Sequence, residues 1–179
     1  MAIELVREYL KAYGRDQDII ELDTSSATVE LAAQALGTGP ERIAKTLSFM
    51  GRDHALLVVC AGDCKIDNHK FKETFHVKAR MLKADEVEKY TNNAKYKAQF
   101  HQKAKMMSAE ELERFTGLRF GGVCPFAMPA PVQVWLDVSL RRFAEVYPAC
   151  GSANSAIKLS NEELQALVPG ARWVDVCKI

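Results

Sequence analysis

An internal repeat between residues 70 and 116 constrains the fold of this chain more than any other feature of its sequence. Residues 70–91 read KFKETFHVKARMLKADEVEKYT, and residues 95–116 read KYKAQFHQKAKMMSAEELERFT. At this offset of 25 residues, 11 of 22 positions are identical, and most others are conservative replacements. Each copy predicts a helix, a short strand and a second helix. Because two copies are too few for a solenoid, we expect a tandem duplication inside a single domain over residues 1–179.

The helices outside the repeat are predicted from apolar spacing and capping residues. Apolar residues at helical spacing indicate a helix over 2–13. Thr28 is a suitable N-cap for a helix over 29–36, which Gly37 would end. Capping boxes, in which a serine and a glutamate three residues later cap each other's amides, mark helix starts at Ser108 and Ser160.

Strands are interspersed among these helices without a regular βαβ order. We expect them over 43–49, 55–60, 132–137, 145–147, 157–159 and 173–176. The strand over 55–60 is almost entirely apolar, so it should be buried on both faces. The predicted fold is therefore mixed α/β, with a curved, barrel-like mixed sheet flanked by helices.

Charge and hydropathy exclude some classes of protein. The net charge of +1 argues against a nucleic-acid footprint over the whole surface, but residues 65–105 hold eleven basic and five acidic residues. This local excess predicts either two solvated helix faces or a basic patch for phosphates. No apolar run approaches a membrane span, and no basic region followed by an apolar stretch opens the chain, so we expect a cytoplasmic protein without membrane contact.

The five cysteines have no disulfide-scaffold spacing, and no second pair or histidine cluster completes a zinc site with Cys60 and Cys64. Cys124 and Cys150 lie close to glycines and could act as nucleophiles if a histidine were near. We expect them instead to be small, partly buried and inert thiols.

A glycine loop at residues 120–126, FGGVCPF, is the first candidate functional element. Gly121 and Gly122 leave backbone amides unobstructed, and Pro125 stiffens the exit from the loop. Such a loop is either a tight turn or a cradle for a carbonyl oxygen, an oxyanion or a phosphate.

Three further segments follow one another in order: Ile43–Leu47, the Gly121–Pro125 loop, and Leu136-Asp137 followed by Cys150–Ser152. In order and spacing they resemble the YbaK/ProX family of prolyl-tRNA editing domains. The resemblance covers nearly the whole chain, apart from about 25 residues that belong to one repeat copy. It implies a mixed sheet of the YbaK/ProX type and hydrolysis of the ester on mischarged tRNA, commonly tRNA for proline. It also implies that no metal or cofactor is needed, that the partner is the acceptor end of aminoacyl-tRNA, and that prolyl-tRNA synthetase is a second candidate partner.

The resemblance also assigns site residues. Lys45 matches the essential lysine, and the loop with Gly121 and Gly122 matches the one that holds the ester. Substrate-binding positions are Thr46, Cys124, Pro125, Asp137, Cys150 and Gly151. Two alternatives stay open: Lys45 as a surface lysine at a strand start, and Asp137 as a residue that ends a strand or binds a backbone amide.

Ester hydrolysis builds negative charge on the carbonyl oxygen, which loop amides and a lysine ammonium can stabilise. No side chain is an obvious general base, so a positioned water or a substrate hydroxyl is the expected nucleophile. A freestanding trans-editing deacylase that removes a small amino acid is the predicted function. The alternative is a non-catalytic tRNA-binding or regulatory module of the same fold. Cysteine, alanine, serine and threonine esters all remain candidate substrates.

The family core needs one helix–strand–helix unit, and this chain supplies two. Both junctions look native, so either copy could fill the core position. We expect the spare unit to pack as an ordered extension, because its apolar residues repeat the core pattern.

Overall fold

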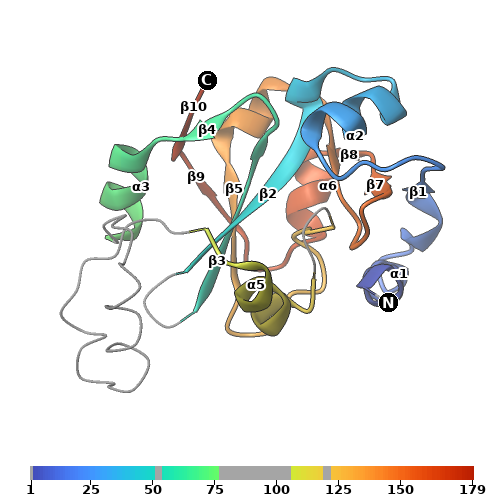
Figure 1. The fold of residues 1–179 in the computed structure, drawn as a ribbon, viewed down its shortest axis with the longest axis horizontal. Coiled ribbons are helices and arrows are strands. Elements are labelled where there is room, and N and C mark those ends of the chain that lie inside the picture. Colours follow the sequence, from blue (N-terminus) through green and yellow to red (C-terminus); the bar gives the residue numbers. More distant parts are fainter. Residues whose placement is uncertain (1, 51–53, 77–105, 119–121) are drawn as a thin grey trace.

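The computed structural model describes residues 2–50, 54–76, 106–118 and 122–179 (Figure 1). Its α-helices are α1 (Ala2–Lys11), α2 (Val29–Leu36), α3 (Asn68–Phe75), α5 (Ala109–Thr116) and α6 (Asn161–Ala166), and its 3₁₀ turns are η1 (Asp16–Asp18), η2 (Pro40–Arg42) and η3 (Val138–Arg142). Its strands are β1 (Ile19–Glu21), β2 (Ile43–Met50), β3 (Ala55–Ala61), β4 (Lys65–Ile66), β5 (Gln133–Asp137), β6 (Glu145–Pro148), β7 (Ser155–Ile157), β8 (Leu159–Ser160), β9 (Arg172–Val174) and β10 (Cys177–Lys178).

Six of the described strands form one mixed sheet in the order β8-β6-β2-β3-β5-β9. β2 pairs with β3 in antiparallel fashion and with β6 in parallel, and β5 is parallel to both of its neighbours. The sheet curls into a half-barrel, with helices around it (Figure 1). The predicted fold class, a curved mixed sheet flanked by helices, is confirmed.

Strand β3 is the centre of the core. All seven of its residues are buried, as its apolar sequence predicts for a strand covered on both faces. Burial of each large aliphatic side chain contributes about 1.5–3 kcal/mol of transfer free energy, so this strand is a principal source of stability. It also places the turn after Ala61 next to the start of β2, because Ala61 is in register with Ala44.

The predicted helix caps are present. The Thr28 hydroxyl accepts a hydrogen bond from the Leu31 amide, and Gly37 ends α2 in the left-handed region at φ 63°. Both capping boxes form, at the starts of α5 and α6. Each such cap typically contributes about 1 kcal/mol, so these helix boundaries are set by local sequence.

The two ends of the repeat region enter the core from different copies. Helix α3 belongs to the first copy, and its Phe71 is fully buried against Phe49 of β2. Helix α5 belongs to the second copy, and its Leu112 is fully buried. Met106 of the second copy forms a bridge to Phe49. The core unit therefore begins with one copy and ends with the other. The predicted packing of the spare unit falls within residues 77–105, outside the described residues.

The C-terminal strand differs from the prediction of a continuous strand over 173–176. β9 ends at Val174, and β10 begins at Cys177 and pairs with β4. The cause is that Val176 leaves the sheet: its amide donates to the Asp137 carboxylate at 2.9 Å, and its carbonyl accepts from the Asp67 amide at 2.8 Å. None of the helices among the described residues is long and apolar enough to span a membrane.

Candidate active site

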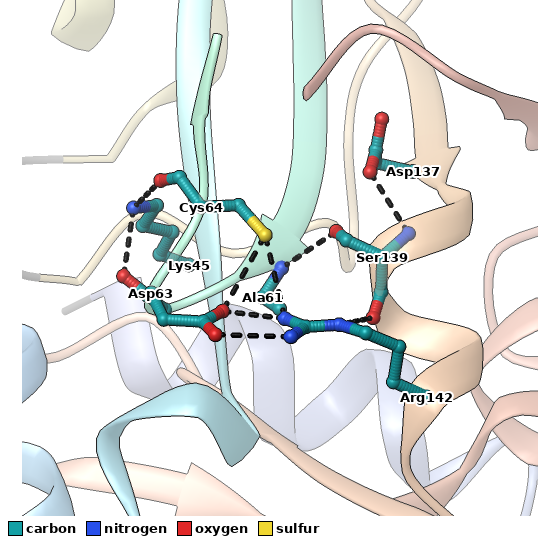
Figure 2. A network of polar contacts seen from close by, with 8 residues as sticks. Lys45, Ala61, Asp63, Cys64, Asp137, Ser139 and Arg142 are labelled. Carbon is teal, nitrogen blue, oxygen red and sulfur yellow. Dashed lines mark hydrogen bonds and ion pairs between the residues drawn. The ribbon is translucent and has the colours of Figure 1, made fainter. Parts of the chain in front are cut away.

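Lys45 lies near the start of β2, and its side chain reaches the turn that follows β3 (Figure 2). The ammonium donates one hydrogen bond to the Gly62 carbonyl oxygen, at 2.9 Å, and another to the Cys64 carbonyl oxygen. The residue is half-buried. Because an ammonium carries three donor hydrogens, these contacts fix its position and leave one donor for a further acceptor.

The turn that holds Lys45 is itself fixed by an ion pair between Asp63 and Arg142 (Figure 2). Arg142 Nη1 donates to Asp63 Oδ2 at 3.0 Å, and Nη2 donates to the other carboxylate oxygen. These hydrogen bonds hold the pKa of the Asp63 carboxyl below its usual value. Arg142 Nε also donates to the Ser139 carbonyl at 3.0 Å, and the Ser139 hydroxyl accepts from the Ala61 amide at 3.2 Å. The turn is therefore attached to η3 at several points.

Asp137 stabilises η3 through its buried carboxylate. The carboxylate is almost completely buried; Oδ1 accepts from the Ser139 amide and Oδ2 from the Val176 amide, both at 2.9 Å. Asp137 thus makes the contacts expected of a residue that binds backbone amides, which is one of the alternatives to a role in substrate binding. The residue does not line the cleft beside Lys45. Its place in the structure is that of a support for the segment that carries Arg142.

A cleft of about 140 Å³ lies along the edge of β2. β6 pairs with β2 only at Ile43 and Ala44, and the next contact along that edge is the bridge between Phe49 and Met106. The cleft occupies the interval between these two contacts. Most of its lining residues are small, apolar or hydroxyl-bearing: Ser26, Ala27, Thr28, Val29, Ala32, Leu36, Ile43, Ala44, Lys45, Thr46, Ser48, Met106, Val123, Tyr147, Ala149, Ser155 and Ala156.

Thr46 brings unpaired polar groups to this cleft. Its hydroxyl oxygen is buried and has no hydrogen-bond partner among the described residues. The Ser48 carbonyl accepts from the Met107 amide, so the backbone groups of Ser48 point away from β3. Because the direction of backbone groups alternates along a strand, the Thr46 amide and carbonyl also point away from β3, toward the open edge. Buried polar groups are normally paired, so Thr46 is unusual here.

The two small-residue loops predicted for the site contact each other. A side chain at Gly122 would place its Cβ 2.8 Å from the backbone of Gly151 and Ser152, so only glycine fits. Gly151 itself has φ 86°, in the region that favours glycine. Of the described residues of the first loop, Val123 lines the cleft, and Pro125 lines a separate cavity. Gly121 lies outside the described residues.

The thiols of Cys124 and Cys150 are buried and free of disulfides. Burial raises the pKa of the Cys124 thiol to about 12 and raises that of Cys150 well above its usual value. Because the thiolate is the nucleophilic form, these environments disfavour attack by either sulfur. They agree with the expectation of inert thiols.

Lys45 and Thr46 are thus the two predicted site residues whose placement brings them to the cleft, and their roles stay predictions. The pair Gly122 and Gly151 packs as structural neighbours, and Asp137 binds backbone amides. Sequence reasoning did not select Tyr147, Ser155 or Met106 for the site.

The sequence model of the aminoacyl-tRNA editing domain family matches residues 23–96 and 91–167. Each of these stretches contains one complete copy of the repeat. This chain belongs to the aminoacyl-tRNA editing domain family. The resemblance to YbaK/ProX domains is therefore confirmed at the level of family.

Relatives of this editing domain are similar over their whole length. The uncharacterised Bacillus subtilis protein YwhH is 45% identical over 179 residues, which are 99% of this chain and 98% of YwhH. The crystal structure of a proposed trans-editing enzyme for prolyl tRNA synthetase has a TM-score of 0.77 at 25% identity and covers 99% of this chain and 98% of that one. The hypothetical protein APE2540 has a similar fold, with a TM-score of 0.73 at 24% identity over 97% and 99% of the two chains.

Proposed function

We propose that this editing domain is a freestanding deacylase that hydrolyses the ester between a small, wrong amino acid and the 3′ end of tRNA. The observation that carries the proposal is the position of Lys45, which lines a small cleft and whose ammonium is held by two carbonyl oxygens of the neighbouring turn. Family membership supports the editing activity. The solved neighbour proposed as a trans-editing enzyme for prolyl tRNA synthetase supports tRNA for proline as the substrate.

Lys45 would act as an electrostatic group. Its third donor hydrogen is available to the ester carbonyl or to the terminal nucleotide, and its two carbonyl contacts keep the charge in place before substrate arrives. A preorganised donor of this kind stabilises the developing oxyanion without reorganisation during the reaction. The ammonium does not need to change protonation state for this role.

Thr46 would supply further donors. Its hydroxyl has no hydrogen-bond partner among the described residues and its amide points toward the open edge of β2, so either could donate to the oxyanion or to the attacking water. Among the described residues that line the cleft there is no histidine, aspartate, glutamate or cysteine. In this proposal the nucleophile is a water or a substrate hydroxyl, held in position by these donors.

The size of the cleft favours a small aminoacyl group. Five alanines line it, Ala27, Ala32, Ala44, Ala149 and Ala156. The volume, about 140 Å³, lies well below the usual range for drug-sized ligands, which begins at roughly 300 Å³. Pocket shape alone discriminates weakly between side chains that differ by one methylene, so alanyl, seryl, cysteinyl and threonyl esters should be cleaved at different but overlapping rates.

The test is deacylation of tRNA for proline charged separately with alanine, serine, cysteine, threonine and proline. We expect at least one small ester to be cleaved and the prolyl ester to be spared. Lys45→Ala should abolish most turnover, whereas Lys11→Ala, which removes an exposed lysine of α1, should not. Tight tRNA binding without turnover on any of these esters would instead support a non-catalytic tRNA-binding module.

A further inference from the structure

A further cavity, open to solvent and of about 520 Å³, lies where η3, α6 and β9 meet. It shares no lining residue with the cleft beside Lys45. Its wall contains two arginines, Arg141 and Arg142, together with Trp173, Gln165 and Glu162. Its volume is within the range of about 300–1,000 Å³ that is typical of small-molecule sites.

A planar cation stacked on a fixed aromatic ring forms one wall of this cavity. The Arg141 guanidinium carbon lies 4.0 Å from the centre of the Trp173 ring system. Trp173 is held in place by a hydrogen bond of 2.8 Å from its indole Nε1 to Gln165 Oε1. Apart from this stacking, Arg141 makes no hydrogen bond or ion pair with the part of the chain that the structure describes. Its guanidinium therefore keeps its donors available.

The segment that carries the arginines is rigidly attached on both sides. Asn161 Nδ2 donates to the carbonyl oxygens of Leu140, at 3.3 Å, and Phe143, at 2.8 Å, and so brackets the two arginines. Arg142 points to the turn that holds Lys45, through its ion pair with Asp63 (Figure 2). The cavity and the Lys45 turn are thus connected through one side chain.

From this arrangement we propose that the cavity binds an unpaired nucleotide of RNA, with the base stacked on the Arg141 and Trp173 pair. Bases stack on aromatic rings and on guanidinium planes, and the free donors of Arg141 suit a phosphate. The Glu162 carboxylate can accept a hydrogen bond from an exocyclic amino group of the base. Where the RNA is tRNA, this inference rests on the proposed function, and the nucleotide belongs to the unpaired 3′ end near the ester.

A nucleotide fits these groups better than a protein partner does. The described wall combines a stacking surface, a guanidinium with free donors and a carboxylate within one cavity, and a nucleotide presents a flat ring, a phosphate and an amino group. The fully buried centre of a protein interface is more apolar than the rest of the surface, whereas Phe143 and Ala144 are the only apolar residues besides Trp173 among the described residues of this wall.

The test uses the fluorescence of Trp173. The chain has two tryptophans, so Trp135→Phe leaves Trp173 as the sole emitter. This variant is titrated with the trinucleotide CCA and with a blunt RNA duplex of matched charge. We expect CCA to quench the emission and the duplex to quench it weakly.

In the same background, Arg141→Ala should weaken CCA binding about fivefold or more, because stacking of a base is lost. Arg141→Lys, which keeps the charge and loses the plane, should recover only part of the affinity.

Arg172→Ala is the matched control, because it removes an exposed arginine one residue from Trp173 on the same strand and should leave quenching within twofold. Absence of quenching by CCA, or equal quenching in the Arg141→Ala variant, overturns the proposal. Quenching by an acidic aromatic peptide but not by CCA overturns it in favour of a protein partner.

If Trp135→Phe does not fold, the affinity of wild-type protein is compared for tRNA with and without its unpaired 3′ nucleotides. Equal affinity for the two then overturns the proposal. These assays need no ester, so they separate failure of this site from failure of deacylation.

Discussion

The side chain of Lys45 crosses from β2 to the Gly62 carbonyl oxygen at 2.9 Å, and this contact determines where its charge lies. We expect Lys45→Ala to fold normally and to lose deacylation by about 100-fold or more, the scale seen when one preorganised oxyanion donor is removed. Lys45→Arg should recover little, because a planar guanidinium does not match two carbonyls placed for an ammonium. Turnover is measured on the ester that the wild type cleaves best. Full turnover in Lys45→Ala would mean that the lysine has only a structural role.

Thr46→Val should separate activity from stability. A buried hydroxyl without a partner costs about 1–3 kcal/mol, and valine keeps the branched shape, so the free energy of unfolding should rise by ~1 kcal/mol. Deacylation should fall about tenfold or more, because a donor at the cleft is lost. Chemical denaturation and single-turnover kinetics give the two values.

The matched control for Thr46 is Thr38→Val. The Thr38 hydroxyl is also buried without a partner in the described structure, but Thr38 does not line the cleft. This change should stabilise the protein and leave turnover as it is. Equal turnover in both valine variants would remove Thr46 from the site.

Arg142→Ala should lower kcat by about 10- to 100-fold with little change in KM for tRNA, because the turn that positions Lys45 loses its ion pair. Arg142→Lys should recover part of the rate, since a lysine can still pair with Asp63. Arg15→Ala is a suitable control, because it breaks a similar surface ion pair with Glu163 at the start of α6. A drop in kcat that is the same for Arg15→Ala and Arg142→Ala would indicate general destabilisation.

The same ion pair predicts a pH dependence. Hydrogen bonds from Arg142 lower the pKa of Asp63 from its ordinary value of 3.8. A carboxyl whose pKa is lower in the folded state contributes stability that is complete above the ordinary value and is lost as the pH falls through the lowered one. Wild-type protein should therefore be more stable than Arg142→Ala at neutral pH, and the difference should shrink below pH 3.8. Unfolding curves collected over this range provide the check, and a constant difference would contradict it.

Cys124→Ala and Cys150→Ala should each keep substantial turnover. Both thiols are buried, and burial raises their pKa values, so we expect neither to act as the nucleophile. Alkylation of the native protein at pH 8 should be slow at both positions, as followed by mass spectrometry. Loss of all activity in a folded alanine variant would restore the cysteine-hydrolase hypothesis.

Removal of residues 77–101 tests the repeat. The deletion joins His76 to Gln102 and leaves one unit, KFKETFHQKAKMMSAEELERFT, with α3 and α5 unchanged. We expect it to fold. It removes six basic and three acidic residues, so the salt dependence of tRNA binding should weaken if those lysines contact tRNA. An unchanged salt slope would show that the segment contributes nothing to tRNA binding.

Local features of the fold were predictable from the sequence, and long-range ones were not. The Thr28 cap and the two capping boxes depend on residues three positions apart, so their signals are contained in short stretches. The order of strands depends on pairings across the chain, such as β2 beside β6, which no short pattern encodes. β9 ends at Val174 because the Val176 amide donates to the Asp137 carboxylate, which lies far away in the sequence.

The residues of the candidate site also divide into those with a local sequence signal and those without one. Lys45 and Thr46 were found from a resemblance at one strand. The opposite wall, which includes Tyr147 and Ser155, comes from strands a hundred residues away and has no signature of its own. The use of both Asp137 oxygens by backbone amides depends on where the C-terminus passes, which the sequence pattern does not specify.

Because the core takes α3 from the first copy and α5 from the second, the junctions of the repeat with the rest of the chain are independent of the number of copies between them. Misaligned recombination between the two copies in the gene would shorten or lengthen the protein by 25 residues at a time and leave both junctions intact. The length of this chain could therefore change by whole units while the strand that carries Lys45 keeps its neighbours.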